Sequence, residues 1–339
     1  MISLDALRAR EVRACARLMR WLDDGLPEAR VLLKQLYPHA GKAWLVGITG
    51  NPGAGKSTLV DGLIQKFRTR GQTVAVVAVD PSSPFSRGAI LGDRIRMQQH
   101  ALDEGVFIRS FATRGHLGGL ASTTADVVHA LDAMGWDVIL VETVGVGQDE
   151  VEIQNLAHTT LVVMAPGMGD EIQAIKAGIL EIADVFVVNK ADRDGADRTV
   201  RELQMMLELG SSVEEPEDGR GHESQARKDF AGPMRRLGPR GWRPRIVKTV
   251  GLTGEGLDGL VEAMLEHKKA YQEAMKDVDF KKALLRREFL EIFRRTLLQR
   301  GWSYLMHEDH IREIVEELFG GKTDPYTLAE QAVSALGRL

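Results

Sequence analysis

The feature that most constrains the fold is a glycine-rich run that joins an apolar segment to a helix-compatible one. The run reads Gly50-Asn-Pro-Gly-Ala-Gly-Lys-Ser57 and fills every fixed position of the P-loop pattern. Residues 44–49 before it suit a buried parallel strand, and Leu59, Val60, Leu63 and Ile64 after it give a helix an apolar face. Such a turn lets backbone N–H groups point at phosphate oxygens at the start of a helix, so the run predicts a phosphate cradle.

Each polar residue of this loop has a definite expected role. Lys56 should reach the β and γ phosphates of a nucleotide, and Ser57 should offer its hydroxyl to Mg²⁺. The residues that we expect to contact the nucleotide here are Gly50, Asn51, Pro52, Gly53, Ala54, Gly55, Lys56, Ser57 and Thr58.

Short runs rich in Val and Ile recur through the middle of the chain, with helix-compatible segments between most of them. They lie at about 44–49, 74–79, 106–111, 137–142, 160–165, 184–189 and 245–250. Continuous apolar runs suit strands that are covered on both faces, which predicts an α/β fold with a doubly wound, mainly parallel sheet. Ligands of such folds bind at the carboxyl ends of the strands.

The base of the nucleotide is indicated by Asn189-Lys190-Ala191-Asp192, which directly follows an apolar run. The carboxylate of Asp192 can accept hydrogen bonds from guanine N1–H and the 2-amino group, whereas adenine offers an acceptor at N1 and lacks that amino group. A mismatch of this kind can discriminate by about 10⁴-fold, so the motif predicts a guanine nucleotide. At the end of the next predicted strand, Val250, Gly251 and Leu252 are expected to wall the base pocket through backbone N–H groups.

Three acidic residues lie at or just beyond predicted strand ends: Asp80, Asp93 and Glu142. Since Mg²⁺ prefers oxygen ligands and usually keeps several waters, these carboxylates can hold the ion directly or through water. A helix cap or a turn carboxylate is the alternative for each of them.

The run that begins at Glu142 has the form of a GTPase switch in which Glu replaces Asp. Gly145 is then placed to donate its N–H to the γ phosphate, and Gln148 is a candidate to orient the attacking water. The spacing of Gln148 from the glycine differs from that of other GTPases, so a role unrelated to catalysis stays open. The candidate catalytic residues are Lys56, Asp93, Glu142 and Gln148.

The two ends of the chain are predicted to be helical. Helical periodicity runs from residue 3 to about 38, with a break near Gly25-Leu-Pro27, and returns after Leu257. We therefore expect an N-terminal helical arm at 1–40, a P-loop GTPase domain at 41–256 and a C-terminal helical extension at 257–339. The apolar stripes after Leu257 need a surface to cover them, which can be the core or a partner chain.

Composition excludes some functional classes. Lys and Arg number 44 against 48 for Asp and Glu, and the net charge of −4 gives no electrostatic case for nucleic acid or an anionic membrane. The single cysteine, Cys15, rules out an intrachain disulfide and a cysteine-rich metal site. There is no signal-peptide pattern and no apolar stretch of membrane-spanning length, so we expect a soluble, cytoplasmic protein.

Taken together, the motifs resemble those of the MeaB/ArgK-type G proteins, bacterial relatives of the human methylmalonic aciduria type A protein. The resemblance covers about residues 40–210. The runs that carry it are Gly-Asn-Pro-Gly-Ala-Gly-Lys-Ser, Val-Asp-Pro-Ser-Ser-Pro, Gly-Asp-Arg-Ile-Arg-Met, Arg-Gly-His-Leu-Gly-Gly-Leu, Glu-Thr-Val-Gly-Val-Gly-Gln, Pro-Gly-Met-Gly-Asp-Glu-Ile-Gln and Asn-Lys-Ala-Asp.

This resemblance implies a slow, Mg²⁺-dependent GTPase that acts as a chaperone for an adenosylcobalamin-dependent acyl-CoA mutase, usually methylmalonyl-CoA mutase. It implies that Mg²⁺ is held near Ser57, Asp80, Asp93 and Glu142, and that residues 165–176 form a switch contacting the mutase. It also implies a homodimer through the C-terminal helices and an indirect link to an adenosyltransferase.

Two other functions remain as alternatives. A metal-insertion GTPase that serves nickel enzymes would usually carry Cys and His metal motifs, which this sequence lacks. An ATP-dependent kinase of a transport protein is disfavoured by the guanine motif.

Overall fold

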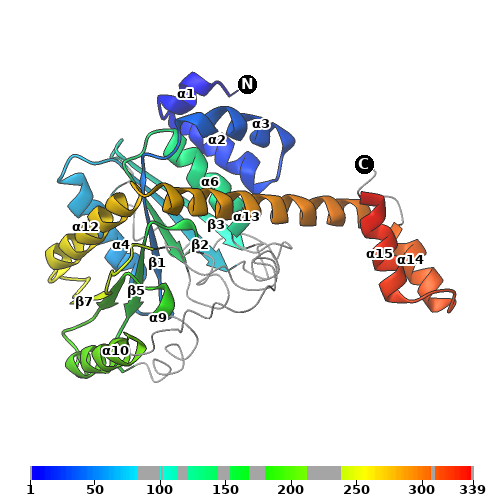
Figure 1. Ribbon diagram of the computed structural model, residues 1–339. Coiled ribbons are helices and arrows are strands. Elements are labelled where there is room, and N and C mark those ends of the chain that lie inside the picture. The colour runs from blue at the N-terminus through cyan, green and yellow to red at the C-terminus, as the bar shows by residue number, and fades with distance from the viewer. Residues whose placement is uncertain are drawn as a thin grey trace. The chain divides into compact units, whose positions relative to one another are not determined.

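Parallel strands form the centre of the part of the chain that extends to Phe280 (Figure 1). The computed structural model describes residues 2–81, 100, 102–113, 121–143, 153, 155–167, 180–211, 238–306 and 310–336. Within these ranges one seven-stranded sheet has the order β3-β2-β4-β1-β5-β6-β7, and every neighbouring pair is parallel. The strands are β1 (Trp44–Thr49), β2 (Val74–Pro81), β3 (Val106–Thr113), β4 (Val138–Thr143), β5 (Thr159–Met164), β6 (Val185–Val188) and β7 (Arg245–Lys248). The predicted α/β fold with a doubly wound, mainly parallel sheet is confirmed.

Alternate side chains of the strands enter separate layers of core on the two faces of the sheet, as the period of two in a strand requires. In β1, Val46 and Ile48 are buried with α4 (Lys56–Arg68) and α12 (Leu257–Ala274). The intervening Leu45 belongs to the layer under α6 (Ala121–Ala133). Between β5 and β7 the described helices are α9 (Leu180–Ile182) and α10 (Ala196–Ser211), and α10 contributes Leu203 to a third apolar cluster with β5 and β6.

The last strand differs from the expectation of a run covered on both faces. All residues of β7 are exposed or half-buried, because β7 is the edge of the sheet. Its two terminal side chains are charged and paired, Arg245 with Glu266 at 2.7 Å and Lys248 with Asp197 at 2.9 Å. Charged residues at a sheet edge discourage pairing with another chain.

Short helices precede β1, as the periodicity predicted: α1 (Leu4–Arg8), α2 (Val12–Asp23), α3 (Pro27–Leu36) and a 3₁₀ turn, η1 (Tyr37–His39). They pack on α6, where Cys15 is 1% exposed and its thiol lies 3.6 Å from the sulfur of Met134. Burial raises the pKa of this thiol to about 11, so Cys15 behaves as an inert core residue. The buried carboxylate of Asp132 accepts hydrogen bonds from the backbone N–H groups of residues 41–43 and fixes the chain as it enters β1.

At the opposite ends of the strands from the P-loop, a buried polar network joins β1, β5, β6 and α12. His267 on α12 lies 2.9 Å from both the Asp184 carboxylate and the Thr159 hydroxyl. Asp184 also accepts from the backbone N–H of Thr160, and the Trp44 indole donates to Thr159. These contacts fix the starting ends of three strands and the helix that covers them.

The described residues divide into two compact units, one that extends to Phe280 and one that begins at Lys281. α12 belongs to the first unit, and its Leu260, Val261 and Met264 are fully buried in the core. The second unit contains most of α13 (Val278–Leu305), together with α14 (His310–Phe319) and α15 (Pro325–Leu336). Among the described residues, no helix is long and apolar enough to cross a membrane.

Candidate nucleotide-binding site

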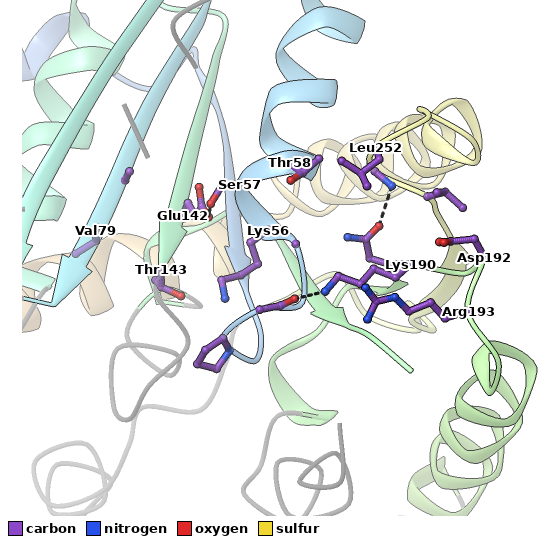
Figure 2. Close-up of a pocket in the computed structure, with 17 residues that line it drawn as sticks. Lys56, Ser57, Thr58, Val79, Glu142, Thr143, Lys190, Asp192, Arg193 and Leu252 are labelled. Atoms are coloured by element: carbon purple, nitrogen blue, oxygen red, sulfur yellow. Dashed lines mark hydrogen bonds between the residues drawn. The ribbon is translucent and has the colours of Figure 1, made fainter. Parts of the chain in front are cut away.

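A pocket of about 530 Å³ lies where the carboxyl ends of β1, β2, β4 and β6 meet the loops that follow them (Figure 2). A volume of this size suits a small-molecule ligand. The residues that line it are Pro52, Gly53, Gly55, Lys56, Ser57, Thr58, Ala78, Val79, Glu142, Thr143, Asn189, Lys190, Asp192, Arg193, Val250, Gly251 and Leu252. The structure thus brings together sequence motifs that are separated by up to two hundred residues.

The phosphate end of the pocket is the loop between β1 and α4. Gly50 and Gly55 have φ angles of +130° and +92°. A Cβ at Gly50 would collide with the backbone carbonyl of Val163, and one at Gly55 with the side-chain amide of Asn189. The loop therefore needs glycine at both positions.

The ammonium group of Lys56 is hydrogen-bonded to the backbone of the P-loop itself. Its Nζ donates hydrogen bonds to the backbone oxygens of Gly50 at 2.6 Å and Asn51 at 3.1 Å, and the residue is only 6% exposed. These bonds place a positive charge at the centre of the cradle. An entering phosphate can replace carbonyl oxygens as the partner of that charge, with a stronger, charge-assisted hydrogen bond.

Ser57 and Glu142 meet at the start of α4. The hydroxyl of Ser57 donates to a carboxylate oxygen of Glu142 at 2.7 Å, and Glu142 is 6% exposed. Two hard oxygen donors on adjacent elements suit Mg²⁺, which takes few protein ligands and retains water. In the described part of the chain no cluster of three or more His, Cys, Asp or Glu forms around them.

Several residues expected at this end lie outside what the structure describes. These are Asp93, Gly145 and Gln148, and of Asp80 only the backbone, at the end of β2, is described. Gly50, Asn51 and Ala54 belong to the loop but do not line the pocket.

At the base end, the side chain of Asn189 connects loops instead of pointing freely at a ligand. It is 2% exposed. Its Nδ2 donates to the backbone oxygen of Ala54 at 2.8 Å, while its Oδ1 accepts from the Thr249 hydroxyl at 3.1 Å and from the Gly251 N–H at 3.0 Å. The expected base-contact residue is therefore a joint between the P-loop and the loop at 249–251.

The next residues of the motif form the wall of the base pocket. Lys190 has a φ angle of +56°, unusual for a residue with a side chain, and its Nζ donates to the Gly53 oxygen at 2.6 Å. Backbone Ala191 donates to Thr249 at 3.0 Å, which ties the motif to the neighbouring loop. Asp192 is exposed and its carboxylate lies at the pocket (Figure 2), where it can meet the edge of a base.

Sequence reasoning missed four pocket residues: Ala78, Val79, Thr143 and Arg193. Thr143 is 1% exposed and its hydroxyl donates to that of Thr49 at 3.1 Å, which links the carboxyl ends of β4 and β1. Ala78 and Val79 could have been found from their place at the end of a predicted strand, just before Asp80.

Sequence comparisons agree with this geometry. The family described as "Methylmalonyl Co-A mutase-associated GTPase MeaB" matches residues 15–304. A protein of Pyrococcus horikoshii that is named a GTPase is 44% identical over 96% of this chain and 95% of its own length. The GTPase ArgK of Escherichia coli is 34% identical over 79% of this chain and 76% of its own length.

Two further similarities concern a mammalian protein and a solved fold. The mitochondrial methylmalonic aciduria type A homolog of mouse is 34% identical over 65% of this chain, which spans 48% of that protein. A crystal structure titled "LAO/AO transport system kinase" superposes with a TM-score of 0.64 at 24% identity, covering 98% of this chain and 96% of that one. At that identity the superposition supports the shared fold.

Replacing Asp192 by Asn should exchange the base that the pocket accepts. An amide can donate to the 2-oxo group of xanthine where the carboxylate accepts from the 2-amino group of guanine, so Asp192→Asn should lose at least about 100-fold in GDP affinity and gain xanthosine diphosphate binding. Isothermal titration calorimetry with both nucleotides measures this exchange. Asp194→Asn, two residues further along the same loop and outside the pocket lining, is the matched control. Unchanged GDP affinity in Asp192→Asn would refute the role given to Asp192.

Proposed function

The chain belongs to the MeaB family of GTPases, and we propose that its GTP hydrolysis serves as the switch of a chaperone for an adenosylcobalamin-dependent acyl-CoA mutase. The single observation that carries the proposal is the pocket itself, which is lined by Asp192, the residue that we propose to read the base, and by the Ser57–Glu142 pair. The association of the family with methylmalonyl-CoA mutase supports a mutase as the partner. Methylmalonyl-CoA mutase is the client that we propose, and we place the protein in the cytoplasm.

We propose that hydrolysis occurs by in-line attack of water on the γ phosphate. Lys56 would offset the charge that develops on the phosphate oxygens, and the backbone N–H groups of the P-loop would orient them. Ser57 and Glu142 are the described residues that would hold Mg²⁺, and the bound ion would supply positive charge to offset that of the phosphates. Asp80 and Asp93 are proposed to complete this metal site, and Gln148 to position the water.

Glu142 lies directly before the segment that we propose as a switch. Glu142 is the penultimate residue of β4, and the chain then continues toward Gly145. We propose that Gly145 donates its N–H to the γ phosphate and that loss of this phosphate releases the segment that follows. A change of this kind can be read by a partner protein, as can one in the segment 165–176, which we propose to contact the mutase. The intrinsic rate would be slow and would rise when the mutase orders these segments.

We further propose that the second unit mediates homodimer formation. Its helix α13 carries large apolar side chains that are 39–64% exposed, namely Leu285, Phe289, Ile292, Phe293, Leu297, Leu298 and Trp302. Exposed apolar surface of this kind marks an interaction site. The same helix has seven basic and three acidic residues, whereas α14 has three glutamates and one arginine, so each helix is electrostatically complementary to the other helix of a second copy.

The mutase proposal is tested by measuring binding of the purified protein to methylmalonyl-CoA mutase with GDP and with a non-hydrolysable GTP analogue. If the nucleotide sets the state that the mutase recognises, the two affinities should differ by about 5- to 150-fold, the usual range of such coupling. The control is Asp192→Asn, which should lose this dependence with guanine nucleotides and regain it with xanthosine nucleotides. Equal affinities in both states, or capture of a nickel enzyme or a transport protein instead, would contradict the proposal.

The homodimer proposal is tested by light scattering coupled to size exclusion. The wild-type chain should elute with twice the mass of one chain, and Phe289→Glu with Phe293→Glu should give the mass of one chain, because two charges would enter an apolar interface. Retention of nucleotide binding by the double variant would show that the first unit is intact. A monomeric wild-type protein at micromolar concentration would overturn the proposal.

A further inference from the structure

Two large, exposed side chains face each other across the base end of the pocket. Leu252 is 90% exposed and lines the pocket. Arg193 is also exposed, and within the described ranges its guanidinium makes no hydrogen bond or ion pair. Figure 2 shows Leu252 on one side of the pocket, Lys190 and Arg193 on the other, and Asp192 at the end between them.

The backbone beneath both side chains is fixed. The N–H of Arg193 donates to the Lys190 oxygen at 3.0 Å, which closes a tight turn after the left-handed Lys190. On the opposite side, Thr253 and Gly254 donate to the Val250 oxygen at 3.1 and 2.9 Å and close a turn around Leu252. Each side chain is therefore carried to the rim of the pocket by a hydrogen-bonded turn.

The two side chains suit contact with the two faces of a purine ring. The hydrogen-bonding edge of guanine can be read by Asp192, but edge contacts leave both faces of the ring exposed to water. A guanidinium is planar, weakly hydrated and stacks on aromatic faces. A leucine offers apolar contact to the other face.

We propose that Arg193 and Leu252 clamp the two faces of the guanine ring, Arg193 by stacking its guanidinium plane and Leu252 by apolar contact. Such a clamp raises affinity for the nucleotide without reading which purine is bound, because both faces of every purine are alike in this respect. It complements Asp192, which reads the edge. The clamp affects nucleotide binding by the protein alone, so its test does not depend on whether the protein binds a mutase.

The position of Arg193 argues against the simplest alternative, a contact with phosphate. The phosphate end is marked by Lys56 and Ser57 on α4, whereas Arg193 follows directly after the base-reading Asp192. A contact with phosphate depends on the number of phosphates and needs a positive charge, while stacking on the base needs a planar group and does not depend on the number of phosphates. The two roles therefore make opposite predictions for GTP against GDP and for lysine against phenylalanine.

The test is the Kd of GDP and of GTP for Arg193→Ala, Arg193→Lys, Arg193→Phe and Leu252→Ala. Arg193→Ala should weaken both nucleotides about five- to tenfold and by the same factor, as expected for a stacking contact worth 1–1.4 kcal/mol. Arg193→Phe should keep affinity within about twofold of wild type, because a planar ring restores stacking. Arg193→Lys should behave like Arg193→Ala, and Leu252→Ala should weaken both nucleotides equally.

Two controls separate the clamp from other effects. Arg198→Ala removes a nearby exposed arginine that pairs with Glu202 and does not line the pocket, so it should leave both affinities unchanged. In the Asp192→Asn background, Arg193→Ala should weaken the binding of xanthosine diphosphate. The factor should equal the one by which Arg193→Ala weakens GDP binding when Asp192 is present. Melting curves without nucleotide should coincide for all variants.

Wild-type affinity in Arg193→Ala would overturn the proposal. So would a loss that is larger for GTP than for GDP and is rescued by lysine but not by phenylalanine, since that pattern assigns Arg193 to the phosphates.

Discussion

The site depends on one buried side chain, the carboxamide of Asn189. It donates to the Ala54 oxygen in the P-loop and accepts from Thr249 and Gly251 in the loop after β7. A buried polar group left without a partner costs about 1–3 kcal/mol. Separating the two loops would break these bonds and incur that cost, so Asn189 stabilises the contact between the loops. The phosphate end and the base end of the pocket thus behave as one piece, and a nucleotide that fits both ends gains from a geometry already formed.

The sheet fixes the same loops from beneath. β1 leads into the P-loop and β6 into the motif at 189–192, while Asp184 and His267 tie the starting ends of β5 and β6 to α12. The strands are buried on both faces over most of the sheet, so their carboxyl ends have little freedom to shift. Rigid strands beneath short loops give a pocket in which small groups, such as the Ser57 hydroxyl and the Glu142 carboxylate, can meet at 2.7 Å.

Much of this arrangement could be predicted from the sequence because it follows from local patterns. The strands are apolar runs bounded by turn residues, and the observed bounds lie within two residues of the predicted ones at every end. The P-loop and the guanine motif are contiguous and carry their own chemistry. The edge position of β7 was not predicted, because Ile246 and Val247 continue the apolar pattern and the number of neighbouring strands emerges only from the order of the sheet.

The parts of the site that escaped prediction are contacts between segments far apart in the chain. The bond from Asn189 to Ala54 spans 135 residues, and that from Thr143 to Thr49 spans 94. Neither has a sequence signature, since a buried Thr or Asn shows its partners only once the sheet has assembled. Arg193 escaped for another reason: an exposed arginine after a turn is ordinary in sequence, and its place on the rim of the pocket emerges from the left-handed backbone of Lys190.

The most direct test of Asn189 as the joint of the site is the Kd of GDP for Asn189→Ala, measured by calorimetry beside Thr249→Val, which removes one of the bonds that Asn189 accepts. Because Asn189→Ala removes bonds to both loops, it should lower the affinity for GDP by at least about 30-fold, equivalent to about 2 kcal/mol. Thr249→Val should lower this affinity less. A protein that stays folded with this loss would show that the residue joins the pocket rather than the core. Wild-type GDP affinity in Asn189→Ala would contradict the joint and the single-piece pocket with it.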